Sequence, residues 1–371
     1  MRPALKPGLL PVWRDRDTLQ IGIDSRRAVA LTGMGGLASV IGLLDGSRDR
    51  AQVIQAAVDE GIPADLAERV LQLLAAAGAL DDFPAGTLRM LSQPLRARLA
   101  AELATVSLAN GDGDGGARTL ARRLAAGVRI YGGGRVGDGI AGLLTTAGVG
   151  RVLPADRPEF RPEDDREAHA AAVPEDAART GPQQTGSGQT DPQRTRPEPT
   201  GSQRTDPQRT RPGRTRSRQT DPWQKGPERP DLAILVGRHS LELRAALMRD
   251  QVPHLSASAD EAIGVVGPLV VPGRTACLTC LDLTRADRDP AWPLILAQLA
   301  GRKPSPLACD APLAAAVAAQ AAGQALAFID RAAAVAAVTD GTLELVLPGW
   351  QWRRRTWPRH SDCSCRCYTF R

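Results

Sequence analysis

Five of the six cysteines fall into two short groups in the second half of the chain. Cys277 and Cys280 form a CxxC pair just after a Pro-Gly turn, and Cys363, Cys365 and Cys367 lie near the C-terminus. Four thiolates in two close pairs are a common ligand set for tetrahedral structural zinc. The sequence therefore predicts a zinc site that joins Cys277 and Cys280 to two terminal cysteines; a set of unrelated thiols is the alternative.

The spacing leaves some ligand choices open. We prefer Cys363 with Cys365 because they are the closer pair, while Cys367 or His360 could replace Cys365. A redox CxxC is not expected, because the motif follows a turn instead of opening a helix at a strand end. Cys309 stands outside both groups, where a small core residue ahead of a helix is a simpler interpretation than a nucleophile.

A glycine pattern, Gly132-x-Gly134-x-x-Gly137, lies between a β-prone run and an apolar helical stretch. Glycines in that context permit a tight turn and close backbone approach to phosphates at a helix N-terminus. Asp156 follows 19 residues after Gly137, near the place where an acid would hold ribose hydroxyls. Gly132, Gly134, Gly137 and Asp156 are thus candidate cofactor-binding residues; a turn that binds no nucleotide is the alternative.

The elements that would position these groups alternate between strands and helices over residues 127–371. A continuous apolar strand is expected at residues 231–237, as in buried parallel sheets. Shorter strands are expected at residues 128–131 and 150–153, with helices at residues 139–147 and 241–250. This alternation predicts an α/β fold with a Rossmann-like doubly wound sheet.

Residues 1–83 predict a smaller module ahead of that sheet. A short strand is expected at residues 19–23, and a helix at residues 63–77 places apolar side chains at helical spacing before Gly78. With two further helical stretches, the pattern suggests a winged-helix-like α+β module; a helical spacer domain is the alternative. Residues 84–126 are expected to form a helical linker.

Residues 157–229 interrupt the α/β pattern. The sequence at 190–197 returns at 205–212 and in part at 220–222, which is a period of 15 residues. Proline recurs throughout and apolar side chains are scarce, so burial cannot offset the entropy lost on ordering. We predict a disordered repeat insertion within the larger domain.

Composition and charge exclude several classes of protein. Residues 186–230 hold ten Lys or Arg against five Asp or Glu, so this segment carries most of the net charge of +6. The remainder is nearly neutral and aromatic residues make up 3% of the chain, so no nucleic-acid partner is expected. No signal-peptide core and no uninterrupted stretch of 18 apolar residues is present, which predicts a cytoplasmic protein without a membrane partner.

These motifs together resemble a known family. Residues 128–152, with the glycine pattern, and residues 264–273, which run into Cys277 and Cys280, resemble ThiF/MoeB-type proteins, the bacterial relatives of ubiquitin-activating enzymes. The likeness covers most of residues 127–371 outside the insertion. It implies a ThiF-like Rossmann domain, structural zinc, a homodimer, and adenylation of a C-terminal carboxylate with ATP and magnesium.

The order of the two domains resembles the subset associated with thiazole/oxazole-modified (TOMM) bacteriocin and microcin biosynthesis. There a PqqD-like module captures the leader of a ribosomal precursor peptide by strand addition, using a free strand edge beside a helix with side-chain pockets. Carried onto this chain, the resemblance implies a peptide groove formed by Leu19, Ile21 and Ile23 together with Val70 on the following helix.

Two departures from active members decide between functions. Active members carry an Arg and a Lys after the ribose-binding acid, where this chain has its insertion. They also carry a metal-binding Asp after the third buried strand, where this chain has Gly237-Arg238-His239. Attack on ATP would lack its main electrostatic support.

The leading hypothesis is therefore a non-catalytic scaffold that presents a precursor peptide to a YcaO-type cyclodehydratase. An ATP-dependent adenylyltransferase acting on a peptide or carrier-protein carboxylate is the alternative. An NAD-dependent oxidoreductase has the weakest support, since no hydride-transfer residues are evident.

Overall fold

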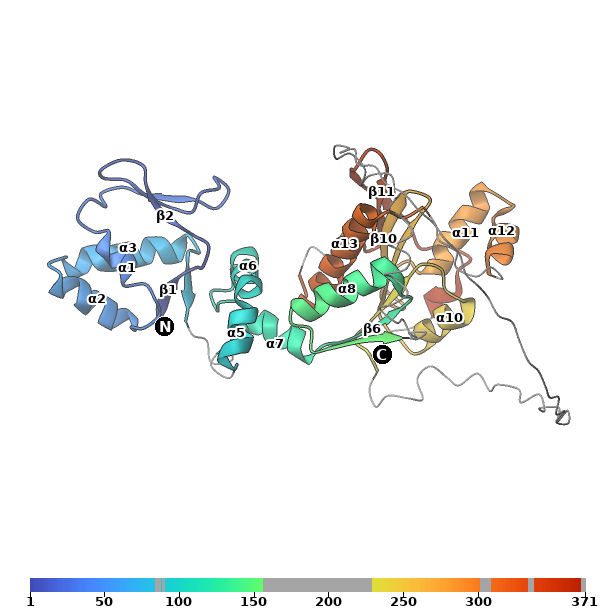
Figure 1. Ribbon diagram of the computed structural model, residues 1–371, viewed down its shortest axis with the longest axis horizontal. Coiled ribbons are helices and arrows are strands. Elements are labelled where there is room, and N and C mark those ends of the chain that lie inside the picture. The colour runs from blue at the N-terminus through green and yellow to red at the C-terminus, as the bar shows by residue number, and fades with distance from the viewer. Residues whose placement is uncertain (84–87, 89–90, 156–228, 301–307, 333–336, 368–371) are drawn as a thin grey trace, which may run out of the picture. The chain divides into compact units, whose positions relative to one another are not determined.

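The computed structural model describes residues 1–83, 88, 91–155, 229–300, 308–332 and 337–367 (Figure 1). Asp156 and the 15-residue repeats lie outside the described residues, so the disordered insertion and the ribose-binding acid stay predictions.

The N-terminal module contains short strands and three helices. Its three-stranded antiparallel sheet has the order β2-β3-β4, and a second pair joins β1 to β5. The strands are β1 (Pro3–Leu5), β2 (Pro11–Trp13), β3 (Leu19–Ile21), β4 (Val29–Leu31) and β5 (Leu80–Asp82). The helices are α1 (Ser39–Gly42), α2 (Arg50–Asp59) and α3 (Ala64–Ala76). The predicted mixture of short strands and helices is present; its likeness to a winged helix stays a prediction.

Local sequence explains the limits of the module's helices. Asp49 and Gln52 form a reciprocal capping box at the start of α2. The stripe predicted for α3 is buried through Ala67, Val70, Leu71 and Leu74, and Gly78 follows the helix with a φ of +68°. These helices enclose a core shared with Leu19 and Ile21 of β3.

The predicted linker is helical, with α5 (Gln93–Arg98), α6 (Ala100–Asn110) and α7 (Ala117–Ala125). Helix α6 shares a buried polar network with the module. The Lys6 ammonium donates to the Ser107 carbonyl at 2.7 Å and lies 3.3 Å from Asp81, which accepts from the Ser107 hydroxyl at 2.6 Å. The packing of the module therefore continues past residue 83 into α6.

A seven-stranded mixed sheet forms the larger domain, in the order β12-β11-β10-β9-β8-β6-β7. Strands β7, β6, β8 and β9 are parallel, whereas β10, β11 and β12 are added antiparallel. The bounds are β6 (Gly127–Tyr131), β7 (Arg151–Ala155), β8 (Leu232–Val236), β9 (His254–Asp260), β10 (Ile263–Val270), β11 (Gly341–Val346) and β12 (Trp352–Thr356). The predicted α/β sheet is thus present, with a parallel part of four strands.

The change from parallel to antiparallel pairing has a local cause. Only Glu261 and Ala262 separate β9 from β10, and their φ angles are +54° and +61°. Two consecutive residues with positive φ make the type I′ turn that matches hairpin twist. A loop this short cannot carry the crossover that a parallel neighbour requires.

Helices α8 (Gly134–Thr146) and α13 (Ala311–Asp330) pack side by side against the sheet (Figure 1). Gly139 permits this approach, because a Cβ there would lie 2.9 Å from the Cβ of Ala318. Among the described helices, α13 alone is long and apolar enough to cross a membrane, but half of its apolar window is buried, as in a core helix. The remaining helices are α10 (Leu241–Arg249), α11 (Leu278–Arg288), α12 (Trp292–Ala300) and the 3₁₀ turn η3 (Ser364–Cys367).

Candidate functional site

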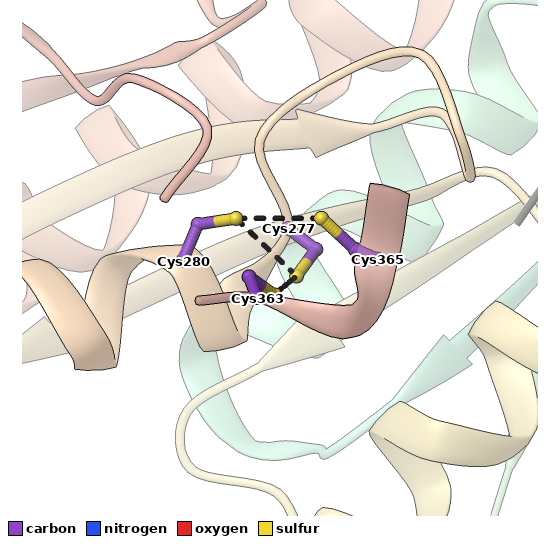
Figure 2. A group of neighbouring side chains, drawn as sticks. All are labelled: Cys277, Cys280, Cys363 and Cys365. Carbon is purple, nitrogen blue, oxygen red and sulfur yellow. Dashed lines mark hydrogen bonds between the residues drawn. The ribbon is translucent and has the colours of Figure 1, made fainter. Parts of the chain in front are cut away.

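The four preferred cysteines lie together. Cys277 is the N-cap of α11 and Cys280 lies in its first turn, while Cys363 precedes η3 and Cys365 lies within it. All four side chains are buried, and their sulfur atoms lie within 4.8 Å of one another (Figure 2). The start of α11 and the segment around η3, which are far apart in the sequence, thus bring their four thiols together.

The geometry of this cysteine cluster fits a tetrahedral metal. Sulfur–sulfur distances are 3.8 Å for Cys277–Cys280 and 3.5 Å for both Cys277–Cys363 and Cys280–Cys365. Zinc–sulfur bonds of about 2.3 Å place tetrahedral sulfurs about 3.8 Å apart. The cluster packs against Met248, Val270 and Ala276. Four sulfur ligands suit a structural metal.

The thiols differ in acidity. The hydrogen bond from Cys277 lowers the pKa of Cys280 to about 4. The pKa of Cys365 is raised to about 12, mainly by burial and secondly by the hydrogen bond with Cys280. Four thiolates packed this closely would repel one another without a cation. The donor set therefore favours a bound divalent metal that neutralises them.

The other candidate ligands have different surroundings. His360 uses Nε2 to contact Asp287 at 2.9 Å, and its Nδ1 accepts from the Asp362 amide at 3.1 Å. Its ring thus supports the loop instead of joining the cluster. The side chain of Cys367 is outside the described residues. Cys309 is partly buried, which raises the pKa of its thiol and disfavours a nucleophilic role.

The predicted glycine turn connects β6 to α8. A Cβ on Gly132 would lie 2.3 Å from the Val236 carbonyl oxygen, and one on Gly137 would lie 2.5 Å from the carbonyl oxygen of Gly132. Gly134 has a φ of +74° and open space around its Cβ position. At positions 132 and 137 a side chain would clash with the backbone, so glycine is required there. At Gly134 the backbone is open to a ligand, as in dinucleotide-binding turns.

The charges at this edge of the sheet differ at one position from those that the family resemblance implies. Residues 235–239, at the end of β8, contain no carboxylate, and Arg238 is exposed there. Asp260, at the end of β9, has its pKa raised by burial, although Arg238 opposes the shift. The described residues thus place Arg238 where a metal-binding acid was expected, with the Asp260 carboxylate close to it.

Sequence patterns alone missed two residues at this edge. Arg135, within the glycine turn, donates to the Cys309 carbonyl at 3.2 Å. Asp260 lies near Arg238 because strand β9 extends to residue 260, beyond the expected end at residue 256. The alternation of Ser and Ala after residue 255 could have predicted the longer strand, and with it the position of Asp260.

The residues predicted for peptide binding have unequal exposure. Leu19, Ile21 and Val70 are buried in the module core, whereas Ile23 is 72% exposed beyond the end of β3. Strand β3 pairs with β2 on one side and with β4 on the other. The free strand edge expected at residues 19–23 is therefore absent over Leu19–Ile21, because β3 is the central strand.

The outer strand β4 offers a free edge instead. Arg14 donates to Thr18 and Gly22 donates to Leu10, which fixes the alternation of hydrogen bonds between β2 and β3. Gln20 therefore bonds to β2, whereas Leu19 and Ile21 bond to β4. Ala30 lies opposite Gln20, so its N–H and C=O point away from the sheet. On β2 the outward positions are Pro11, which has no N–H, and Trp13. Strand β4 thus presents the outward amide and carbonyl of Ala30 to an added strand.

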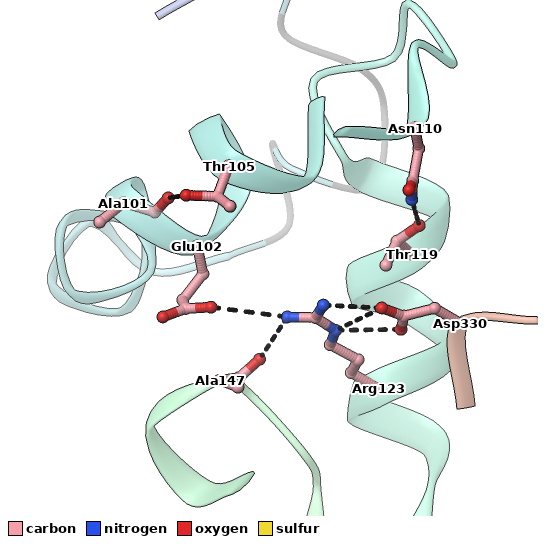
Figure 3. Close-up of polar contacts among 8 residues, drawn as sticks. All are labelled: Ala101, Glu102, Thr105, Asn110, Thr119, Arg123, Ala147 and Asp330. Atoms are coloured by element: carbon pink, nitrogen blue, oxygen red, sulfur yellow. Dashed lines mark hydrogen bonds and ion pairs between the residues drawn. The ribbon is translucent and has the colours of Figure 1, made fainter. Parts of the chain in front are cut away.

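One buried arginine fixes the linker to the larger domain. Arg123 of α7 donates to Asp330, at the end of α13, with its closest contact at 2.7 Å (Figure 3). It also donates to the Ala147 carbonyl at 3.2 Å and lies 3.6 Å from Glu102 of α6. The guanidinium is only 7% exposed, so this network is a structural joint between helices.

No protein-family model matches the sequence, and no curated protein matches it either. Solved structures do match. The heterocyclase TruD shares 14% identity with a TM-score of 0.57, over 98% of this chain and 42% of that chain. Escherichia coli MccB, crystallised with succinimide, shares 16% identity with a TM-score of 0.60 over 100% of both chains. The chain has the fold of MccB and of part of the TruD chain.

At the level of fold, this likeness agrees with the resemblance drawn from the glycine and cysteine motifs. The chain spans less than half of TruD, whereas it covers 99% of MccB crystallised with AMPCPP and MccA, at 15% identity and a TM-score of 0.58.

Proposed function

We propose that this protein is a non-catalytic ThiF-like scaffold in thiazole/oxazole-modified peptide biosynthesis. It binds the leader of a ribosomal precursor peptide through its N-terminal module and presents the peptide to a separate YcaO-type cyclodehydratase. The outward edge of β4 is the observation that carries the proposal. The fold of a heterocyclase, and of a protein crystallised with MccA, supports the peptide-handling role.

The site chemistry supports a non-catalytic role. Residues 235–239 supply Arg238 and His239 where an adenylating enzyme would need a carboxylate. Without a carboxylate at that position, magnesium would lack the ligand that the resemblance implies there as charge develops on the α-phosphate. The protein's contribution is recognition, with the chemistry left to its partner.

The leader would add to β4 as a fourth strand. Backbone hydrogen bonds at Ala30 give affinity. The module also has exposed apolar side chains for the peptide, among them Leu66 and Leu73 of α3, which are 37% and 49% exposed. These two leucines lie seven residues apart, on one face of the helix. They are the apolar contacts that we assign to the leader.

Calorimetric titration with the leader of a candidate precursor peptide, chosen from the neighbouring genes, tests the proposal. Ala30→Pro should weaken binding at least tenfold, because it removes the outward N–H without breaking a bond to β3. Pro11→Ala is the matched control on the other edge and should leave affinity unchanged. Equal binding by wild type and Ala30→Pro, or no binding by wild type, would refute leader capture at β4.

An ATP-dependent adenylyltransferase is the second candidate. The intact glycine turn favours it, and MccB has been crystallised with ATP. Pyrophosphate exchange with the same peptide separates the two functions. The scaffold predicts no exchange above background, whereas exchange that Gly134→Asp abolishes would establish the enzyme.

Finer features belong to the same proposal. The metal held by the cysteine cluster is zinc, in a structural role, and the protein acts as a homodimer in the cytoplasm, where its precursor peptide is made. Reduced, buried thiols suit that compartment.

A further inference from the structure

Strand β12 forms one edge of the seven-stranded sheet. Among the described strands it pairs only with β11, and residues 353–356 are exposed to solvent. Such an edge offers backbone donors and acceptors that another extended chain can use.

The register decides which backbone groups of β12 face outward. The N–H of Trp357, directly after the strand, donates to the Asp340 carbonyl at 2.9 Å, so these two residues form a hydrogen-bonded pair. Every second residue before Trp357 therefore also bonds to β11, namely Arg355 and Arg353. The outward N–H and C=O groups belong to the intervening positions, Trp352, Arg354 and Thr356.

Two arginines beside this edge have no acidic partner in the described chain. Arg353 and Arg355 point to the same face of the sheet, because alternate residues of a strand do so. Arg355 stacks over the Trp357 ring at 4.3 Å, which holds its guanidinium in place. Arg353 lies opposite Glu344 in the register, but the Glu344 carboxylate accepts from the Thr342 hydroxyl at 2.9 Å and forms no ion pair with either arginine.

The pair of strands keeps a positive charge. Strands β11 and β12 contain three arginines and one glutamate, which leaves a net charge of +2. The charges beside them nearly balance one another. Asp282 is shared by Arg244 and Arg285, so this group carries one positive charge, which offsets the negative charge of Asp340.

Backbone and charge together select the kind of chain that fits this edge. A second copy pairing through β12 would place its own arginines on the neighbouring strand, which is unfavourable. A nucleic acid would meet the charge but leave the outward backbone groups unused. An acidic strand satisfies both, with its acidic side chains beside Arg353 and Arg355. The residues between those acids would donate and accept the backbone hydrogen bonds, and their side chains would lie on the opposite face.

We propose that the outer edge of β12 binds an extended acidic segment of another polypeptide by strand addition, with an acidic residue at every second position. This site lies on a different strand from the one assigned to the leader, and it selects a peptide by charge. The inference goes beyond the scaffold function and does not depend on it, so its failure would leave leader capture at β4 unaffected.

Fluorescence anisotropy of the full chain with labelled peptides of about ten residues tests this edge. A peptide of alternating Glu and Val should bind, whereas one of alternating Lys and Val should not. A peptide of alternating Glu and Pro keeps the negative charge but lacks the N–H groups that would bond to β12. Its affinity should therefore be at least tenfold lower than that of the Glu–Val peptide.

Variants of the chain locate the binding. Arg353→Glu combined with Arg355→Glu should weaken binding of the Glu–Val peptide by about tenfold and reduce its dependence on salt. Arg249→Glu on α10, where the side chain is 70% exposed, is the matched control and should bind like wild type. Ala30→Pro, which alters the edge of β4, should also bind like wild type.

Several outcomes would overturn the inference. They are no binding of the Glu–Val peptide to wild type, equal affinity for the Glu–Val and Glu–Pro peptides, and unchanged affinity in the double arginine variant. Binding of oligothymidylate as tightly as the Glu–Val peptide would also overturn it, because the edge would then attract negative charge of any kind.

Discussion

At the scale of single residues, the cysteine cluster shows how much spacing can predict. The two closely spaced groups of cysteines in the sequence predicted the candidate ligands. Only the fold could show that Cys365 lies with Cys277, Cys280 and Cys363. The sequence could not exclude His360, because its role depends on Asp287, which lies 73 positions away. Contacts between distant residues are set by tertiary packing, which local spacing does not encode.

Removal of one ligand should release the metal. We expect purified wild type to contain about one zinc per chain and Cys277→Ser to contain almost none, with a Tm lower by roughly 10 °C. The reason is that three buried thiols cannot complete the tetrahedral site. Cys309→Ser is the matched control, since Cys309 lies outside the cluster. Elemental analysis and thermal unfolding measure both effects, and equal zinc in wild type and Cys277→Ser would contradict the assignment.

Burial of His254 should make stability depend on pH. Burial lowers the pKa of His254 to about 4, against an ordinary value of 6.5, although its contact with the Val252 carbonyl opposes the shift. As pH falls through this interval the unfolded chain takes up the proton first, so the folded state loses up to about 3 kcal/mol.

His254→Gln isolates this contribution. The stability advantage of wild type over the variant should be fully present above pH 6.5 and should shrink as the pH falls toward 4. Denaturant unfolding at each pH measures it, and titration of the cysteines cancels in the difference. Parallel stability curves for the two proteins would show that His254 does not carry the effect.

At the scale of elements, the glycine turn assigns different tasks to its three glycines. Gly132→Ala and Gly137→Ala should each cost several kcal/mol, because the new methyl group would meet a backbone carbonyl oxygen at 2.3 Å or 2.5 Å. Gly134→Ala should cost only about 1 kcal/mol, from its positive φ, because the space beside it is open. Chemical denaturation ranks the three variants; equal losses would contradict the distinction.

Strand periodicity predicted most of the sheet but not its edges. The apolar run at residues 231–237 identified β8, because a strand buried on both faces is apolar throughout. By contrast, the pattern at residues 19–23 could not reveal that β3 is central, since pairing partners are chosen by register with β2 and β4. The start of α8 was expected five residues late, because glycines weaken the helical signal where the turn requires them.

At the scale of the whole molecule, two buried polar joints tie the linker helices to their neighbours. Lys6 and Asp81 connect the module to α6, and Arg123 connects α7 to Asp330. Buried ion pairs need good geometry and several hydrogen bonds to offset desolvation. The Arg123 joint meets this condition, whereas Oδ1 of Asp81 in the Lys6 joint accepts no hydrogen bond from the described residues. Both joints hold linker helices against their neighbours.

Breaking the joint at Arg123 should therefore affect the stability of the folded chain. Arg123→Met leaves the Asp330 carboxylate only 8% exposed and without its main partner, which should cost about 3–5 kcal/mol. Arg122→Met is a close control, because Arg122 is exposed and donates a single bond to the Asp330 carbonyl at 3.0 Å. Equilibrium unfolding compares the two. A double variant, Arg123→Met with Asp330→Leu, should recover part of the loss by removing the stranded charge; no recovery would mean that Arg123 acts mainly through Glu102 and the Ala147 carbonyl.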